Sequence, residues 1–162
     1  MAVLRVGVLT SSDTRSAGGG EDTSGAALKS LSTGQGWEVV AYHLLPDDRD
    51  ALAAALVEMA DVDHCDIVFT TGGTGLGPRD VLPETTLAVC DREVPGIGEV
   101  IRGESLKITD RAMVSRGTAG QRGTTLIVNM PGSEKAVRES FGFVVGVLEH
   151  AVEMMAGGGH AS

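Results

Sequence analysis

The sequence is poor in the residues that most often bind transition metals. It has two cysteines and four histidines among 162 residues. Cys65 and Cys90 do not form a Cys-x-x-Cys pair, and the histidines form no cluster with the spacing of metal ligands. These spacings argue against a zinc site. Both cysteines are expected to be small buried thiols.

Basic residues and long apolar runs are also scarce. Thirteen Lys and Arg stand against 22 Asp and Glu, which gives a formal net charge of -9. Non-specific binding to nucleic acid requires Lys and Arg to neutralise phosphates, so this balance argues against it. No apolar run reaches the length of a membrane span, and the chain begins with a strand pattern instead of a leader peptide. We therefore expect a cytoplasmic protein without membrane segments.

Aromatic residues make up only 3% of the chain, whereas hydrophobic residues make up 42%. The core is therefore expected to consist of aliphatic side chains. A length of 162 residues suits one domain, and the 23 glycines show no collagen-like period. We predict a domain at residues 1–156, followed by a flexible tail at 157–162.

Strand and helix patterns alternate along the chain, which predicts a single three-layer α/β domain with a mostly parallel sheet. Apolar, β-branched runs predict strands at residues 3–10, 38–45, 66–70 and 124–129. Helical spacing of apolar residues predicts helices at 26–31, 51–59, 83–89, 99–108 and 134–152.

The ends and links of these elements can also be predicted. Thr23 or Ser24 is expected to cap the first helix, Asp48 the second and Ser133 the last. In the helix at 99–108, Val100 and Leu106 are expected to face inward beside Ile101. Residues 14–21, 92–98 and 117–123 are expected to be loops, and Arg116 and Arg122 belong to the last of these connections.

A glycine-rich loop follows the third predicted strand. Gly72, Gly73, Gly75 and Gly77 fall within six residues, as is typical where the backbone needs positive φ or approaches a ligand closely. The spacing does not fit the dinucleotide fingerprint, and the residue after the last glycine is Pro78, not the Lys of a P-loop. The loop is therefore either another kind of phosphate loop or only a tight connection.

Charged and polar residues follow the other predicted strands at the same sheet edge, where ligands bind in open α/β folds. They are Asp13, Asp47 and the pair Gly132-Ser133, which also begins a helix suited to a phosphate. Asp47 could alternatively be a solvated turn residue, and Asp22 a helix cap. Carboxylates repel a polyphosphate by about 1 kcal/mol per charge pair in water at ~4 Å, and about 4 kcal/mol at a dielectric of 20. The pattern therefore predicts a bridging Mg²⁺.

The glycine loop also carries a resemblance. Residues 71–80 (TGGTGLGPRD) with 83–86 (PETT) resemble the signature of the molybdopterin adenylyltransferases, the MogA/MoaB family of molybdenum cofactor biosynthesis. The likeness extends from about residue 6 to 150. Further blocks match in order at 11–14 (SSDT), 22–25 (DTSG), 45–48 (LPDD), 105–109 (SLKIT) and 129–133 (NMPGS).

The resemblance implies a reaction: Mg²⁺-dependent transfer of AMP from ATP to the terminal phosphate of molybdopterin, with release of pyrophosphate. It implies that Asp47 and Asp80 are catalytic and organise the metal. The residues implied at the nucleotide and its phosphates are Gly72, Gly73, Thr74, Gly75, Arg79, Gly132 and Ser133. Those implied at molybdopterin are Asp13, Asp22, Ser24, Ser105 and Lys107.

The resemblance also implies a homotrimer or hexamer, and a separate protein that inserts molybdenum. Two alternatives stay open on the sequence: a non-catalytic protein that binds or carries molybdopterin, and another nucleotide-dependent transferase on the same fold. Lys107 could also merely cap the end of its helix. The residues do not distinguish a molybdenum pathway from a tungsten pathway.

Overall fold

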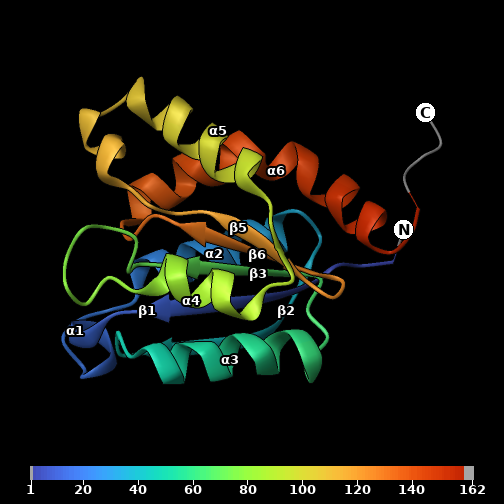
Figure 1. The fold of residues 1–162 in the computed structure, drawn as a ribbon, viewed down its shortest axis with the longest axis horizontal. Coiled ribbons are helices and arrows are strands. Elements are labelled where there is room, and N and C mark those ends of the chain that lie inside the picture. Colours follow the sequence, from blue (N-terminus) through green and yellow to red (C-terminus); the bar gives the residue numbers. More distant parts are fainter. Residues whose placement is uncertain (1, 159–162) are drawn as a thin grey trace.

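The structure is a computed structural model that describes residues 2–158 (Figure 1). Residues 159–162, which form most of the predicted flexible tail, lie outside the described residues. The chain builds one six-stranded sheet in the order β2-β1-β3-β6-β5-β4. Its strands are β1 (Arg5–Ser11), β2 (Glu38–Leu45), β3 (Ile67–Thr71), β4 (Arg92–Glu93), β5 (Ala119–Arg122) and β6 (Thr125–Met130).

Four neighbouring strands, β2, β1, β3 and β6, are parallel, and β5 and β4 add two antiparallel strands at one side. This arrangement confirms the mostly parallel sheet. The carboxyl ends of the four parallel strands lie at one edge. From β1 the chain continues to β2 on one side of it, whereas the later strands β3 and β6 lie on the other side of β1. The order therefore reverses between β1 and β3, which is where open α/β sheets form a ligand crevice.

Helices cover both faces of the sheet, which confirms the three layers (Figure 1). Helices α2, α5 and α6 pack together on one face, and α3 and α4 pack together on the other. The helices are α1 (Asp13–Ser16), α2 (Thr23–Gly34), α3 (Arg49–Asp61), α4 (Leu82–Val89), α5 (Pro95–Leu106), the short 3-10 helix η1 (Asp110–Val114) and α6 (Glu134–Met155). No helix among residues 2–158 is both long and apolar enough to cross a membrane.

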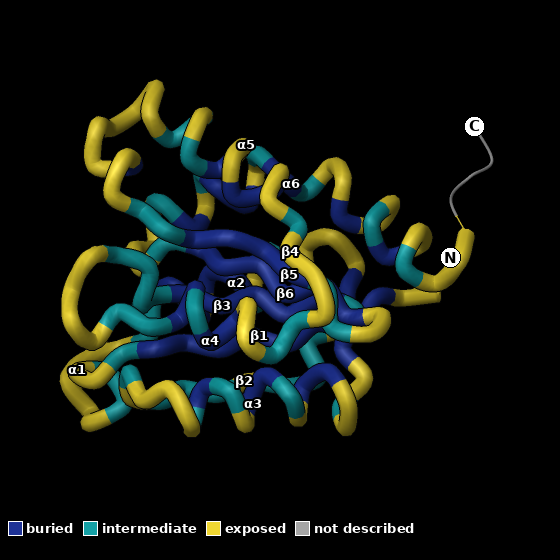
Figure 2. Tube along the Cα trace, in the orientation of Figure 1, coloured by how far each residue is buried: buried dark blue, intermediate teal, exposed yellow. Residues whose placement is uncertain are grey.

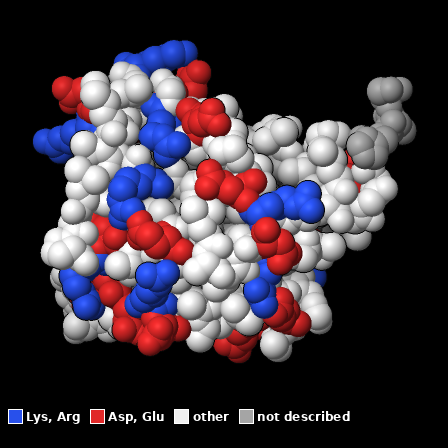
Figure 3. All heavy atoms as spheres, in the orientation of Figure 1, with Lys and Arg blue, Asp and Glu red and all other residues white. Residues whose placement is uncertain are grey.

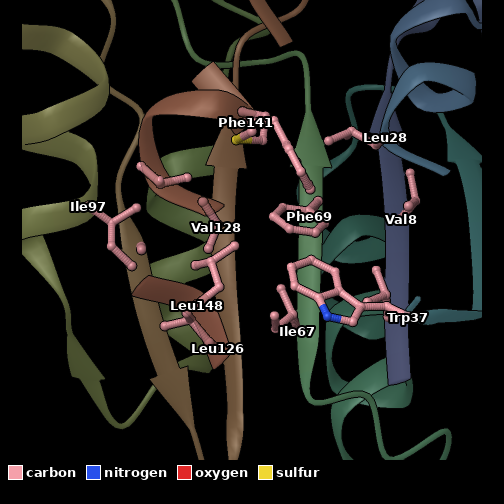
Figure 4. Packing of buried hydrophobic residues seen from close by; sticks show 14 of the residues in the cluster. Val8, Leu28, Trp37, Ile67, Phe69, Ile97, Leu126, Val128, Phe141 and Leu148 are labelled. Atoms are coloured by element: carbon pink, nitrogen blue, oxygen red, sulfur yellow. The ribbon is translucent and has the colours of Figure 1, made fainter. Parts of the chain in front are cut away.

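The sheet is the buried centre of the molecule, and the outer sides of the helices are exposed (Figure 2). On the α2–α5–α6 face, the few aromatic residues gather among aliphatic ones (Figure 4). The ring of Phe141 lies 5.6 Å from that of Phe69 and 6.0 Å from that of Trp37. Burial of such a side chain contributes about 1.5–3 kcal/mol, so this cluster anchors α6 to β3.

The opposite face is packed by aliphatic residues of α3 and α4 against the sheet. Cys65 belongs to this cluster, and burial raises the pKa of its thiol to about 12. Cys90 packs beside it half-buried, and burial raises the pKa of its thiol to about 11. Both thiols are therefore protonated at neutral pH. The prediction of buried thiols is confirmed for Cys65, whereas Cys90 is only partly buried.

Two of the predicted helix caps are confirmed and one is wrong. Asp48 accepts a hydrogen bond from the amide of Ala51 at the start of α3, and Ser133 caps α6. The cap of α2 is Asp22, not Thr23 or Ser24, because its carboxylate accepts a hydrogen bond from the Gly25 amide at 3.0 Å. The helix therefore begins at Thr23, before the start that either predicted cap would allow.

Three predicted loops contain regular structure. Residues 14–21 include the end of α1, and residues 92–98 contain β4 and the first turn of α5, which begins at Pro95. Proline suits the first turn of a helix because its missing N–H has no helical partner there. The glycine-rich connection at 117–123 forms β5, whose pairing with β6 satisfies its backbone. Sequence periodicity is weak for such short elements.

The start of α5 changes which of its residues face inward. Ile97 and Ile101 are buried, whereas Val100 and Leu106 are 45% and 43% exposed. The prediction that Val100 and Leu106 pack in the core is therefore wrong. Ile97 takes the inward position one turn before Ile101, because the helix starts at Pro95 and extends the stripe backward.

Candidate active site at the strand ends

The carboxyl ends of β1 and β3 meet through backbone alone. Gly72 follows β3 with φ of 90°, and a Cβ atom built on it would lie 2.4 Å from the carbonyl oxygen of Ser11. Gly73 also has positive φ, 67°. Gly132, after β6, packs against Gly72 from the other side. The first reason for glycine here is therefore the close approach of three strand ends, which brings their loops into one site.

Asp47, at the end of β2, is bound to the end of β1. The Ser11 hydroxyl donates a hydrogen bond of 2.5 Å to Asp47 Oδ1, and the Asp13 amide donates one of 3.3 Å to Asp47 Oδ2. The Asp47 amide in turn donates to Asp13 Oδ1 at 2.9 Å. These bonds fix both predicted carboxylates at the same edge of the sheet, so the simple interpretation of Asp47 as a solvated turn residue is not sufficient.

Arg79 joins the glycine loop, defined as residues 72–80, to this pair of carboxylates. Its Nε and Nη2 donate to the two oxygens of Asp13, each at 3.0 Å. The hydrogen bonds from Arg79, and then the one from the Asp47 amide, lower the pKa of Asp13 below its ordinary value of 3.8. Both side chains are well exposed, at 61% and 44%. Exposed pairs are weak, so Arg79 can exchange Asp13 for another anion at little cost.

Asp80 folds back under the glycine loop. Its Oδ2 accepts a hydrogen bond of 2.8 Å from the Gly77 amide, and the Asp80 amide donates to the Gly77 carbonyl at 3.0 Å. Cβ atoms on Gly75 and Gly77 would lie 2.9 and 2.8 Å from this carboxylate oxygen. These two glycines therefore allow the backbone to wrap around the Asp80 carboxylate.

Asp22 is occupied by contacts within the protein. Besides capping α2, its Oδ2 accepts hydrogen bonds from the Thr10 hydroxyl, at 2.7 Å, and from the Tyr42 hydroxyl. Burial, and then the hydrogen bond to Asp22, raises the pKa of Tyr42 to about 12. Ser24 lies in the first turn of α2 and is buried, with 1% exposure. The cap interpretation of Asp22 is confirmed, and a role of Asp22 or Ser24 at molybdopterin stays a prediction.

A cleft of about 440 Å³ opens beside the glycine loop, between α5, η1 and the start of α6. Thr74 of the loop forms part of its wall, so the cleft and the loop are adjacent. Its polar lining includes Thr74, Arg102, Ser105, Arg111, Ser133 and Lys135. Three of these side chains are cationic, whereas Glu139 is the one acidic residue among the described residues of the lining, in a protein whose net charge is -9. The cleft is therefore suited to an anionic ligand.

Two residues predicted at molybdopterin lie differently with respect to this cleft. Ser105 lines it, whereas Lys107 is the C-cap residue of α5 and does not belong to its lining. The Lys107 Nζ instead contacts the carboxylate of Glu104 at 2.9 and 3.1 Å. This geometry agrees with the simpler interpretation of Lys107 as a residue at a helix end. Its assignment to molybdopterin stays a prediction.

Comparison with known proteins identifies the family. Residues 7–150 match the family described as "Probable molybdopterin binding domain". The chain belongs to this family. The matched range includes all the strands except the first residues of β1, and every site residue described above.

Named relatives and solved structures agree with this family membership. Proteins named molybdopterin adenylyltransferase are 38% identical in Helicobacter pylori strain J99, covering 97% of this chain and 90% of the relative, and 39% identical in Escherichia coli K12, covering 86% and 73%. The molybdopterin biosynthesis enzyme MoaB of Thermus thermophilus is 45% identical with a TM-score of 0.90, covering 96% and 98%. The tungsten cofactor synthesizing protein MoaB of Pyrococcus furiosus is 31% identical with a TM-score of 0.87, covering 96% and 98%.

The side chains of this site suit a Mg²⁺ ion held by one or two carboxylates better than a metal enclosed by the protein alone. Among residues 2–158 there is no group of three or more His, Cys, Asp or Glu side chains able to enclose an ion. Mg²⁺ commonly uses only one or two carboxylates and completes its shell with water and substrate phosphates. The carboxylates of Asp47, after β2, and Asp80, in the glycine loop, fit this way of binding Mg²⁺.

Sequence reasoning missed four cations near the site of this molybdopterin-binding family member. Arg102, Arg111 and Lys135 come from α5, η1 and α6 and meet only at the cleft. Arg116 precedes β5, and its backbone amide donates to the Thr74 carbonyl at 2.8 Å. A basic residue close to a glycine-rich segment was the only signal available for Arg116, and a single sequence offers no spacing that reveals its partners.

Proposed function

We propose that this chain is a molybdopterin adenylyltransferase, which transfers AMP from ATP to the terminal phosphate of molybdopterin and releases pyrophosphate. The observation that carries the proposal is the adjacency of two sites. A glycine loop with Arg79 and Asp80 lies at the reversal point of the sheet beside Asp47, and Thr74 of that loop also lines a cationic cleft. The names of the relatives in Helicobacter pylori and Escherichia coli support the same reaction.

We assign the triphosphate to the strand ends. Gly72, Gly73 and Gly75 bring backbone close to this edge, and Arg79 forms an exposed pair that a phosphate can replace. The N-terminus of α6, with its cap Ser133, supplies unpaired amides and a partial positive charge. These groups hold phosphates without covalent chemistry, which suits a transfer that depends on positioning and on charge neutralisation.

We assign Asp47 and Asp80 to the metal and the reacting phosphates. Two carboxylates beside a triphosphate would repel it, by about 4 kcal/mol for each pair at ~4 Å and an effective dielectric of 20. Bound Mg²⁺ supplies the neutralising charge. The protein contributes the position of each carboxylate: Asp47 is fixed by Ser11 and the Asp13 amide, and Asp80 by the Gly77 amide.

We assign molybdopterin to the cleft of about 440 Å³. Its volume lies within the range of ordinary small-molecule sites. Arg111 and Lys135 in its wall suit the anionic end of the ligand, and Ser105 supplies a hydroxyl. Because Thr74 lines the cleft, a phosphate held at that end lies next to the glycine loop. This arrangement brings the attacking phosphate of molybdopterin to the phosphates of ATP.

We also propose that the protein assembles as a homotrimer or hexamer. Helices α5 and α6 leave an apolar groove of about 590 Å³, and beside it Val100 and Val147 are 45% and 47% exposed. Burial of such a surface against another copy is favourable. Light scattering should show a trimer or a hexamer, and Val147→Lys should lower the mass; a stable monomer at micromolar concentration contradicts the proposal. A cytoplasmic location and a separate protein for molybdenum insertion stay predictions.

The test of the reaction uses neighbouring aspartates with different roles. Asp47→Asn and Asp80→Asn should each lower the rate of pyrophosphate release by about 10²–10³, because each removes one electrostatic contribution to the reaction. Asp48→Asn is the matched control, since Asp48 caps α3 and Asn caps helices about as well. All three variants should unfold at nearly the wild-type temperature.

Two outcomes would contradict these assignments. If Asp47→Asn keeps its rate but melts at a much lower temperature, Asp47 is a structural residue. If the wild-type protein binds molybdopterin but releases no pyrophosphate with ATP and Mg²⁺, the chain is a binding or carrier protein and the adenylyltransferase proposal is wrong.

A further inference from the structure

Arg116 holds the glycine loop from outside. It lies in the connection between η1 and β5, 36 to 41 residues from the loop carbonyls it contacts. Its Nε donates to the Gly75 carbonyl and its Nη2 donates to the Asp80 carbonyl, each at 2.8 Å. One guanidinium therefore binds both ends of the segment 75–80, which contains Arg79 and ends at Asp80.

The other two contacts of Arg116 fix the guanidinium itself. Its backbone amide donates to the Thr74 carbonyl at 2.8 Å, and its Nη1 contacts the carboxylate of Glu84. Glu84 lies in the first turn of α4, directly after the loop. Arg116 is thus bound at three positions of the loop and once after it, and its charge is paired.

Apart from the exposed Arg79–Asp13 pair, few other side-chain contacts define the conformation of the loop. Leu76 is 68% exposed, so apolar burial does not hold the loop. Within segment 75–80 the two bonds between Gly77 and Asp80 form one small turn. Glycine has more backbone freedom than any other residue, and this freedom must be lost when the loop is ordered. The bonds from Arg116 hold Gly75 and Asp80, the two ends of segment 75–80, to the connection that leads into β5.

We propose that Arg116 is a positioning residue for the adenylyl transfer: it fixes the glycine loop so that Asp80 and Arg79 are held ready for the substrate phosphates. This inference rests on the proposed function. It goes beyond that function because Arg116 acts through the loop and is not assigned to metal, nucleotide or molybdopterin. It also gives the segment beside it a role, since Ser115 lines the cleft that we assign to molybdopterin.

Arginine is required because its donors form a planar fork. Nε, Nη1 and Nη2 reach three acceptors in different directions at once. Lys keeps the positive charge but offers one compact ammonium group, which cannot reach both ends of the loop and Glu84 together. Arg116→Lys therefore separates the geometry of the guanidinium from its charge.

The chain offers a matched control in Arg122, which also makes three guanidinium hydrogen bonds. It donates to both oxygens of Asp61, at 3.1 and 2.6 Å, and to the Val89 carbonyl at 2.7 Å. Its side chain is 27% exposed, close to the 34% of Arg116. Its partners belong to the ends of α3 and α4, away from the glycine loop. Arg122→Lys should therefore cost similar stability without disturbing the loop.

The experiment compares Arg116→Lys, Arg122→Lys and wild type. In Arg116→Lys, kcat for pyrophosphate release should fall about 10- to 100-fold, as expected for a misplacement of about 1 Å. KM for ATP should change less than about threefold, because Arg116 does not bind the nucleotide. In the ligand-free protein, amides of residues 72–82 should exchange with deuterium at least about tenfold faster, since this segment loses its outer bonds. Arg122→Lys should match wild type in both measurements.

Three results would overturn the proposal: unchanged loop exchange in Arg116→Lys, unchanged kcat, or equal losses in Arg122→Lys. If Arg116→Lys does not fold, Glu84→Gln provides the second variant, because it removes the charged partner of Nη1 and should give the same changes in smaller degree. No change with Glu84→Gln would then also refute the proposal. If the wild-type protein releases no pyrophosphate, the proposed function is refuted instead. Hydrogen exchange of the loop then still tests whether Arg116 fixes the conformation of the loop.

Discussion

The contact between the ends of β1 and β3 makes Gly72 the most sensitive glycine of the site. In Gly72→Ala, the new methyl group would lie 2.4 Å from the Ser11 carbonyl oxygen, which belongs to the backbone and cannot rotate away. The residue would also keep φ of 90°, a conformation that L-residues rarely adopt. Both effects act at the end of β1, which precedes Asp13 and whose Ser11 is hydrogen-bonded to Asp47.

The size of the effect follows from three contributions. A non-glycine residue at positive φ costs about 1–2 kcal/mol, and forcing a methyl group into packed backbone costs about 1–3 kcal/mol. The lower freedom of Ala in the unfolded chain offsets about 0.4–1 kcal/mol. The expected loss is therefore about 1–5 kcal/mol in the free energy of unfolding. For a chain of this length it corresponds to a fall in Tm of about 2–20 °C.

Gly132→Ala is the matched control on the other side of the same contact. A Cβ atom on Gly132 would lie 3.5 Å from the Gly72 Cα, an ordinary van der Waals distance, and Gly132 is not among the glycines with positive φ. We expect a change of less than about 1 kcal/mol. Urea denaturation and thermal melting of both variants provide the measurement. If Gly72→Ala is as stable as Gly132→Ala, the close contact with Ser11 does not determine the glycine.

Two further predictions concern the charged residues. Hydrogen bonds from Arg79 lower the pKa of Asp13 below 3.8 in the folded protein. The ionised Asp13 therefore stabilises the fold above pH 3.8, and this contribution is lost as the pH falls through the pKa of the folded state. Urea denaturation should therefore show a constant difference between wild type and Asp13→Asn from about pH 5 to 8, which vanishes in more acidic solution; a difference that grows on acidification contradicts this sign. In binding titrations, Lys135→Ala should weaken the binding of molybdopterin roughly fivefold, equivalent to about 1 kcal/mol for one charge pair in water. Lys107→Ala should have a smaller effect, because Lys107 pairs with Glu104. A larger loss in Lys107→Ala would instead support the assignment made from the sequence.

Most of the fold could be predicted because its long elements have strong local signals. The second strand was expected at residues 38–45 and occupies Glu38–Leu45, and Asp48 and Ser133 cap the expected helices. Strand β5 was not expected, because its four residues are stabilised by pairing with β6 and not by a pattern of their own. The start of α5 at Pro95 was missed for a similar reason, since a proline after a short polar segment is equally typical of a loop.

The candidate site divides along the same line. The position of Asp47 and of the glycine loop with Arg79 and Asp80 at one edge could be predicted, because the ends of parallel strands share an edge: Asp47 comes shortly after β2 and the loop begins directly after β3. The contacts of Arg116 could not be predicted, because they depend on how the connection between η1 and β5 lies beside the glycine loop. For Asp22 the sequence left a helix cap and a ligand role open; the Gly25 contact confirms the cap, and the role at molybdopterin stays a prediction.

The distribution of charge explains how a protein with a net charge of -9 can offer a site for two anionic substrates. Acidic and basic side chains are interspersed on the face shown in Figure 3, and no single sign covers it. Near the glycine loop, Arg79 pairs with Asp13 and Arg116 pairs with Glu84, so these four charges nearly cancel. A phosphate is attracted by nearby charges far more than by distant ones, because salt screens charges beyond about 8–10 Å. The remaining Asp47 and Asp80 carboxylates are then the local excess of negative charge, and this excess is the reason why we propose that a divalent cation accompanies phosphates at this edge.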